Sequence, residues 1–565
     1  MTRLFKSHHK RKVTSLNGFW RFKIDPDRAG ESEKWYADFP KDSRAVLVPG
    51  CWNTELGLYH YEGGAWYQRE FETTKSRANL VFHGFYGLIR VYVDGKEVGS
   101  QYGGFAGYQC LVKGLAPGKH NLVVFTDNSH NDRNTIPLAR VDWFHYGGLF
   151  RSVELMELED AWIKDCRIDY RLDIAQATAH LDLHVAIQNF SVSREELKVY
   201  LDEQLLAART VSFQGNAGDV HSITITDLLV PNVRLWEPAN PNLYQIRLEL
   251  ENDDLTERIG FRTITVQDGK LLLNNREIKL KGINRHEDHP DWGFAVPLKL
   301  MKKDLDIIKN LGCNAIRGSH YPNAPIFLDL LDQEGILFWE EIPMWGFPEH
   351  ALKDPLTLKR GLAMHEQMIK RDYHHPSIII WGLHNEIDSR TKAALDVTKA
   401  FAAEIRSLDP TRPITYATMH PLDDICLPFV DIISINLYFG WYSGEVEQWE
   451  SFLRDFKAKM QNEGLSGKPM IISEFGAGAL YGESTFEQQK WSENYQEKYL
   501  EYTLNLFLND PDIIGTYIWQ YCDVRTAREL ELGRPRSFNN KGIVNEYRKP
   551  KQAYWTVRKM YTGAR

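Results

Sequence analysis

The first half of the chain alternates hydrophobic and polar residues in short runs that Gly, Pro and Asp interrupt. Residues 88–93 form one such run, and Asp94-Gly95 follows it directly. Asp-Gly between alternating runs predicts a β-hairpin, because both residues tolerate the left-handed backbone that a tight turn requires. Similar runs, such as 180–187, continue to about residue 267. We therefore predict two all-β sandwich domains, over residues 1–160 and 161–267.

The second half of the chain changes character. After residue 275, short apolar runs alternate with helical patterns, of which residues 298–311 are a clear case, and this order predicts a parallel sheet. The strands are predicted at 278–284, 315–318, 337–342, 378–383, 414–416, 432–437, 470–473 and 514–519. Eight strands over residues 268–565 are typical of a (β/α)8 TIM barrel. The alternative, an open doubly wound sheet, predicts a glycine-rich phosphate-binding turn after its first strand, and residues 283–287 contain no glycine.

Composition narrows the class of protein. Among 565 residues, 43% are hydrophobic and 25% are charged, which is ordinary for a globular protein. The mean hydropathy of −0.42 argues against a membrane protein. The amino terminus is basic but has no apolar run of a secretory signal, and the six cysteines are scattered. We therefore expect a cytoplasmic protein with reduced thiols and no membrane partner.

Charge is distributed unevenly along the chain. The net charge is −8, yet residues 525–565 contain eleven Lys and Arg against three Glu. A basic end on an acidic protein predicts an acidic partner there. Nucleic acid is one alternative, but no recognition motif supports it. We expect the cations beside the last helix, at 548, 549, 551, 558 and 559, to be solvated.

Two glutamates each follow a clear apolar strand. Glu386 ends the fourth predicted strand and Glu474 ends the seventh. A barrel enzyme carries its chemistry at these strand ends, and two carboxylates that face each other are what a glycosidase requires. Simple pairing of each glutamate with an arginine is the structural alternative. A metal site at residues 286–289 is disfavoured because adjacent residues rarely converge on one ion.

Several motifs resemble glycoside hydrolase family 2. Residues 381–386, Trp-Gly-Leu-His-Asn-Glu, are similar to the family's acid/base signature, and residues 472–476 to its nucleophile strand. Residues 282–287 and 317–322 are similar to its first two barrel strands, and residues 142–151 to its sugar-binding sandwich. The resemblance implies a jelly-roll-like domain, an immunoglobulin-like domain and a TIM barrel. It also implies a retaining mechanism without metal or cofactor, in which Glu474 is the nucleophile and Glu386 the acid/base.

Within that family, residues 539–543 resemble the Asn-x-Lys signature of β-glucuronidases, which implies that Asn539 and Lys541 hold a sugar carboxylate. The resemblance implies further substrate contacts from Asp142, His320, Asn385, Tyr438, Tyr442, Trp519 and Arg536. Arg534 competes with Arg536 for the sugar carboxylate, and we favour Arg536.

The function that we predict is a retaining exo-β-glucuronidase, which acts on a small-molecule or oligosaccharide uronide. β-Galacturonidase is the first alternative, because the two sugars differ at one stereocentre, and β-galactosidase is disfavoured by Lys541. A second alternative, from another class of protein, is a carbohydrate-binding protein without catalytic activity. The presence of both glutamates disfavours it. Because relatives in the family associate, the resemblance implies that this protein is a homo-oligomer.

Overall fold

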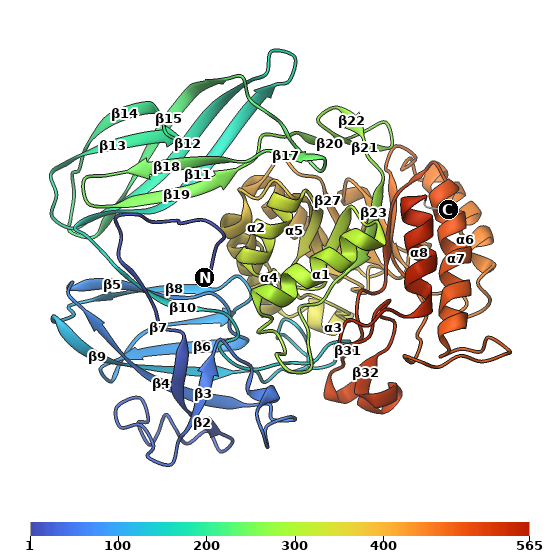
Figure 1. The fold of residues 1–565 in the computed structure, drawn as a ribbon, viewed down its shortest axis with the longest axis horizontal. Helices are drawn as coiled ribbons and strands as arrows, with labels where there is room; N and C mark the ends of the chain where they lie inside the picture. The colour runs from blue at the N-terminus through green and yellow to red at the C-terminus, as the bar shows by residue number, and fades with distance from the viewer. Residues whose placement is uncertain (1, 564–565) are drawn as a thin grey trace.

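A computed structural model describes residues 2–563, apart from the side chains of residues 529, 531 and 532. It has three parts, two β-sandwiches on one side and a closed barrel on the other (Figure 1). The fold that the sequence predicted, two sandwiches followed by a TIM barrel, is confirmed. Among the helices of the described residues, none is long and apolar enough to cross a membrane.

The N-terminal sandwich packs a four-stranded sheet, β1-β10-β5-β8, against a six-stranded sheet, β3-β2-β4-β9-β6-β7. Its strands are β1 (Val13–Ser15), β2 (Gly18–Asp25), β3 (Arg44–Val48), β4 (Gly64–Thr73), β5 (Arg77–Phe82), β6 (Gly87–Val93), β7 (Lys96–Gly103), β8 (Tyr108–Lys113), β9 (Gly118–Asp127) and β10 (Val153–Glu157). The predicted hairpin is β6–β7, in which Asp94 and Gly95 both have positive φ, at 49° and 77°.

The immunoglobulin-like domain packs the sheet β11-β12-β15 against β14-β13-β18-β19. Its strands are β11 (Ala161–Asp173), β12 (Thr178–Asn189), β13 (Arg194–Leu201), β14 (Gln204–Ser212), β15 (Asp219–Pro231), β18 (Tyr244–Glu249) and β19 (Asp254–Ile259), with a short pair β16 (Trp236–Glu237) and β17 (Asn240–Pro241). Next in the chain are β20 (Ile264–Gln267), β21 (Lys270–Leu273) and β22 (Arg276–Glu277). Ile264, Leu271 and Leu273 share a core with barrel residues such as Leu280, so this small sheet closes the amino end of the barrel.

Eight parallel strands close the barrel in chain order. They are β23 (Leu280–Asn284), β24 (Ala315–Gly318), β25 (Leu337–Glu341), β26 (Ile378–Asn385), β27 (Ile414–Thr418), β28 (Ile433–Asn436), β29 (Met470–Phe475) and β30 (Ile513–Ile518). The helices are α1 (Leu298–Leu311), α2 (Pro325–Glu334), α3 (Glu349–Leu352), α4 (Pro355–Asp372), α5 (Lys392–Leu408), α6 (Gln448–Asn462), α7 (Glu493–Asn509) and α8 (Gln552–Thr562). Each observed strand overlaps the range predicted for it. The prediction succeeds because strands that are buried on both faces have unbroken runs of apolar residues.

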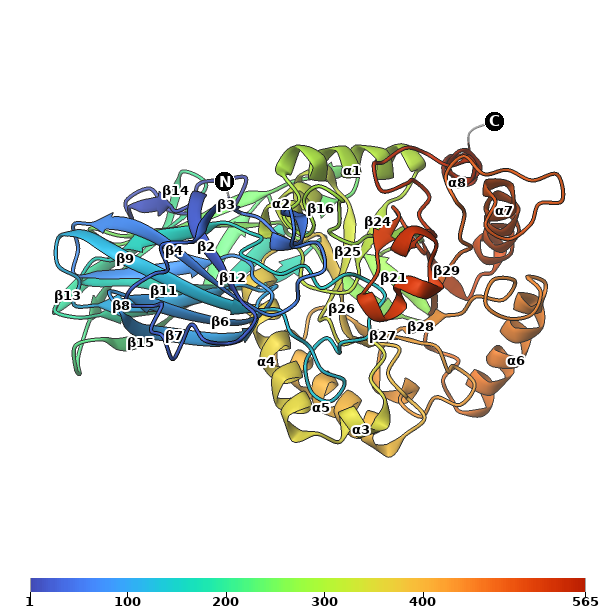
Figure 2. The ribbon, with the colours of Figure 1, turned by 90° about the horizontal axis from the view of Figure 1, so that it is seen from below.

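The segment after β30 folds back across the carboxyl ends of the strands (Figure 2). It contains β31 (Val524–Arg525), η3 (Arg528–Gly533), η4 (Pro535–Ser537) and β32 (Phe538–Asn539). The expectation that the cations beside α8 are solvated is wrong for two of them. Arg548 and Lys551 are buried and pair with Asp304 at 2.9 Å and with Asp523 at 2.8 Å. Both hold this segment onto the barrel.

Candidate active site

Both predicted glutamates lie at the carboxyl ends of barrel strands. Glu474 belongs to β29 and Glu386 follows β26 directly, where its φ of 52° turns the chain out of the strand. Around them, side chains from five strands form a continuous hydrogen-bonded group that we call the carboxylate cluster. It consists of Arg317, Glu341, Asn385, Glu386, Asn436 and Glu474.

Glu474 is held from two sides. Arg317 Nη1 donates to its Oε1 at 2.8 Å, and the Tyr438 hydroxyl donates to its Oε2 at 2.6 Å. Burial raises the pKa of Glu474, while the Arg317 charge and the Tyr438 hydrogen bond oppose that rise. Both oxygens are therefore oriented by donors, as an anionic nucleophile requires.

Arg317 connects the members of the carboxylate cluster. Its guanidinium forms two hydrogen bonds to Glu341, at 2.9 and 3.0 Å, and donates to Asn385 Oδ1 at 2.6 Å. The same group lies over the Trp339 ring, 4.5 Å from its centroid. A bidentate arginine fixes geometry as well as charge, so the direction of the Glu474 carboxylate is set by several strands at once.

Glu386 has a different environment. Asn436 Nδ2 donates to its Oε1 at 2.9 Å, and no cation lies within ion-pair distance of it among residues 2–563. Burial first, and the neighbouring charge of Glu474 second, raise the pKa of Glu386 to about 8. The carboxyl therefore retains its proton at neutral pH, which is the state that a general acid needs.

Asn385 lies between the two carboxylates. Its Oδ1 accepts from Arg317 and, at 3.1 Å, from Asn436 Nδ2. Its Nδ2 is buried and has no partner among the described residues. A buried donor without a partner is costly, so a hydroxyl of a bound sugar is the natural acceptor.

The Trp519 side chain, just beyond β30, forms an aromatic wall with two histidines. The His320 ring stacks on Trp519 with centroids 5.2 Å apart, and His286 meets Trp519 edge-on at 5.5 Å. The Nε2 atoms of both histidines are buried without a partner in the part of the chain that the structure describes. Sequence reasoning weighed His286 only as a metal ligand. Its position directly after the first barrel strand was the signal that could have placed it here.

A second group of polar side chains, which we call the loop cluster, lies beside the first. Its members come from loops of two domains and, for Asn539, from the short strand β32; they are Asp142, Tyr442, Arg534, Asn539 and Lys541. Lys541 Nζ donates to the Tyr442 hydroxyl at 2.5 Å and lies 5.5 Å from the centroid of the Tyr438 ring. Since Tyr438 also binds Glu474, the two clusters share a wall.

Asp142 joins the N-terminal sandwich to the loop cluster. Its Oδ2 accepts from Arg534 Nη2 at 2.8 Å and from Asn539 Nδ2 at 2.7 Å. Its Oδ1 is buried and has no partner among the described residues. This oxygen is available to accept a hydrogen bond from a ligand.

Lys541 is the most informative member of the loop cluster. It is 2% exposed, and no carboxylate lies within ion-pair distance of it among the described residues. Burial lowers the pKa of Lys541. A buried ammonium without a counterion is unstable relative to one that meets an anion, so the cluster is prepared for an anionic group.

Arg536 does not reach this cluster, contrary to the expectation. It pairs with Glu546 at 2.8 Å and directs Nη2 to Asn540. The η4 turn separates the two arginines, and their partners differ, because Arg534 pairs with Asp142 and Arg536 with Glu546. The proposed role of holding a sugar carboxylate therefore moves to Arg534.

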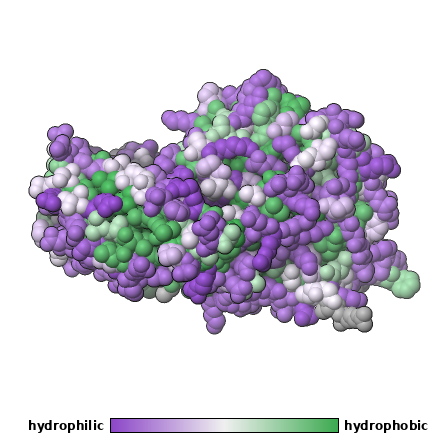
Figure 3. All heavy atoms as spheres, turned by 90° about the horizontal axis from the view of Figure 1, so that it is seen from above, coloured by the Kyte–Doolittle hydropathy of each residue, from purple (hydrophilic) through white to green (hydrophobic). Residues whose placement is uncertain are grey.

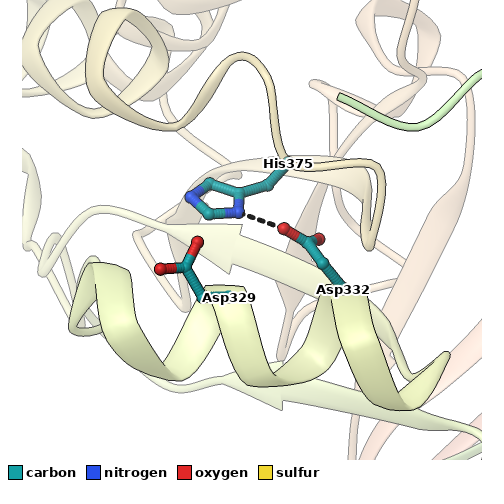
Figure 4. Close-up of side chains that lie close together, drawn as sticks. All are labelled: Asp329, Asp332 and His375. Atoms are coloured by element: carbon teal, nitrogen blue, oxygen red, sulfur yellow. Dashed lines mark hydrogen bonds and ion pairs between the residues drawn. The ribbon is translucent and has the colours of Figure 1, made fainter. Parts of the chain in front are cut away.

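A separate group of ionisable side chains links the domains far from this site. Asp329 and Asp332 of α2 lie beside His375, with potential ligand atoms within 4.8 Å of one another (Figure 4). Asp329 already accepts from Arg3 at 3.0 Å and lies 3.3 Å from Arg258. We interpret the group as an ion-pair network that fastens the N-terminal arm and the immunoglobulin-like domain to the barrel.

Comparison with known proteins agrees with this architecture. The chain matches the family models "Glycosyl hydrolases family 2, sugar binding domain" over 13–159, "Glycosyl hydrolases family 2" over 161–262 and "Glycosyl hydrolases family 2, TIM barrel domain" over 264–565. The chain belongs to glycosyl hydrolases family 2 and is a glycoside hydrolase.

Among its relatives, a β-glucuronidase of Paenibacillus borealis is 30% identical over 96% of both chains. A solved β-galacturonidase from Eisenbergiella tayi, bound to galacturonate, is 36% identical, covers 100% of both chains and has a TM-score of 0.93. The crystal structure of Ruminococcus gnavus β-glucuronidase is 28% identical over 100% of this chain and 98% of the other, with a TM-score of 0.88.

Proposed function

We propose that this chain is an exo-acting, retaining β-hexuronidase with β-glucuronides as its first candidate substrates. The observation that carries the proposal is the buried Lys541 ammonium, which has no carboxylate partner in the described residues and lies near the Tyr438 ring, whose hydroxyl binds Glu474. Asn539 and Arg534 add donors to the same place. A neutral hexose would leave that ammonium uncompensated, whereas a uronate carboxylate pairs with it.

The different environments of the two glutamates support a double displacement. Glu474, oriented by Arg317 and Tyr438, attacks the anomeric carbon and displaces the leaving oxygen, which takes the Glu386 proton. The glycosyl ester on Glu474 is then hydrolysed by a water that Glu386 deprotonates, which restores both groups to their starting states. Asn385 Nδ2, free to donate, is the proposed contact of the 2-hydroxyl.

β-Galacturonides are the second candidate substrates. The galacturonidase from Eisenbergiella tayi is more similar to this chain, at 36% identity, than the two β-glucuronidases named above, at 30% and 28%. The sugars differ only in the direction of the 4-hydroxyl. Asp142 Oδ1, His286 Nε2 and His320 Nε2 are buried without a partner among the described residues, and we propose that they discriminate between the two directions.

A direct test compares kcat/KM for 4-nitrophenyl β-D-glucuronide, β-D-galacturonide and β-D-galactoside. We expect one uronide to exceed the galactoside by about 100-fold, because a charged hydrogen-bonded contact is worth about 1.5–3 kcal/mol. Lys541→Met should lower kcat/KM for that uronide by roughly 10- to 100-fold and leave the galactoside rate unchanged. Preference for the galactoside in both proteins would refute uronide specificity. The cytoplasmic location and the homo-oligomer stay predictions.

A further inference from the structure

A large groove lies far from the carboxylate cluster. It has a volume of about 700 Å³ and runs between the immunoglobulin-like domain and the loops that precede β26, β27 and β29, at the amino end of the barrel. Figure 3 views the molecule from the side of the immunoglobulin-like domain, where hydrophobic and hydrophilic surface alternate. We call this feature the seam groove. Residues that line it include Ile168, Tyr170, Arg262, Ile264, Tyr373 and Lys468.

The walls of the seam groove suit a compact organic molecule. Tyr170 and Leu172 of the immunoglobulin-like domain and Val266 of β20 are half-buried and contribute apolar surface, and Tyr373 contributes apolar surface from the barrel. Small-molecule sites are commonly found between domains, have volumes of roughly 300–1,000 Å³ and combine apolar walls with a few polar groups. The groove meets each of these conditions.

Arg262 supplies the first polar group. It is 5% exposed, and its Nε and Nη2 donate to the carbonyl oxygens of Pro376 and Ile378, at 3.0 and 2.6 Å. Its Nη1 has no partner, and no carboxylate pairs with it, among the described residues. Arg412 donates to the same Ile378 carbonyl but is neutralised by Asp409 at 2.6 Å. Arg262 is therefore a buried cation whose hydrogen bonds go only to carbonyl oxygens, while the Asp409 charge acts on it from beyond ion-pair distance.

Lys468 supplies the second polar group. Its ammonium donates to the carbonyl oxygens of Pro428 and Val430 and pairs with no carboxylate among the described residues. The neighbouring Arg406 occupies Asp431 at 2.5 Å. Burial lowers the pKa of Lys468 and lowers the pKa of Arg262 to about 10. An anion bound in the groove would stabilise the charged form of both side chains.

We propose that the seam groove binds a small organic anion, an aryl or alkyl carboxylate or sulfonate. The acidic group meets Arg262 and Lys468, and the apolar body lies against Leu172 and Val266. Because the groove is at the amino end of the barrel, its occupant does not compete with a sugar at the carboxyl end. The site is thus independent of the proposed uronidase activity.

The proposal is tested with 8-anilinonaphthalene-1-sulfonate, an aromatic anion whose fluorescence rises in an apolar site. We expect saturable binding to the full-length protein, and at least about tenfold weaker binding of the uncharged analogue N-phenyl-1-naphthylamine, which lacks the sulfonate. Equal affinity of the two probes would overturn the role of the cations.

Gly467 provides a variant that blocks the groove without disturbing the fold. It lines the groove, and a Cβ atom added there meets no atom within 4 Å. Gly467→Trp should therefore abolish saturable binding of the sulfonate, and the matched control Gly467→Ala should retain it. Glycosidase activity should be unchanged in both proteins and serves as the check on folding.

A second variant tests the binding site without introducing a bulky side chain. Lys468→Gln removes one cation from a partly exposed position and should weaken binding of the sulfonate by about tenfold, with less effect on the uncharged probe. Unchanged sulfonate binding in both Gly467→Trp and Lys468→Gln would place the probe elsewhere and refute the proposal.

Discussion

The carboxylate cluster and the loop cluster lie side by side, yet they are built in different ways. The first takes its side chains from strand ends and is connected by Arg317 and Asn436. The second takes them from loops of the N-terminal sandwich and of the barrel, joined through Asp142 and Tyr442. Reacting groups require fixed geometry, which strands supply, whereas recognition can be altered through loops without disturbing the barrel.

This contrast predicts that substitutions in the carboxylate cluster mainly lower kcat. The largest effect is expected for Glu474→Ala, because it removes the proposed nucleophile, which two donors orient. We expect kcat to fall by roughly four orders of magnitude or more, measured with a 4-nitrophenyl uronide. Circular dichroism should show an intact fold, and activity within tenfold of wild type would contradict the assignment.

Glu386→Ala is expected to have the next largest effect, of about 10²- to 10⁴-fold in kcat for a substrate with a poor leaving group. A good leaving group needs little protonation, so its glycosylation step should be much less affected. Because the pKa of Glu386 is about 8 and its protonated form is active, wild-type kcat/KM should fall as pH rises above about 8. If the fall in kcat/KM above pH 8 persisted in Glu386→Ala, it would arise from the titration of another group.

Tyr438→Phe should lower kcat by about 10- to 100-fold, because it removes a charged hydrogen bond from Glu474 but no charge. The hydroxyl lowers the pKa of Glu474, so its loss raises that pKa. The ionised form of Glu474 is the active one, and the acidic limb of kcat/KM should therefore move to higher pH. If the acidic limb of the pH profile stayed at its wild-type position, Tyr438 would not act on the pKa of Glu474.

The same contrast explains what the sequence could and could not predict. Apolar runs locate the strands, and a residue that ends a strand must lie at the mouth of the barrel, so Glu386 and Glu474 were found from the pattern and the family motifs. A loop has no such periodicity. The direction of Arg534 and Arg536 depends on a three-residue turn, and the pairing of Arg548 with Asp304 depends on contacts between distant segments.

The smallest expected effect separates those two loop arginines. Arg534→Ala removes the ion pair to Asp142 and the hydrogen bond to Tyr442, so KM for a uronide should rise by about two- to tenfold with kcat nearly constant. Arg536→Ala is the matched control, since its contacts, to Glu546, Asn540, Asp523 and the Phe538 ring, include no member of the loop cluster, and its KM should stay within about twofold of wild type. If Arg536→Ala raised KM more than Arg534→Ala did, the contact with the sugar carboxylate would be assigned to Arg536 and not to Arg534. If neither changed KM, recognition of the sugar carboxylate would rest on Asn539 and Lys541 alone.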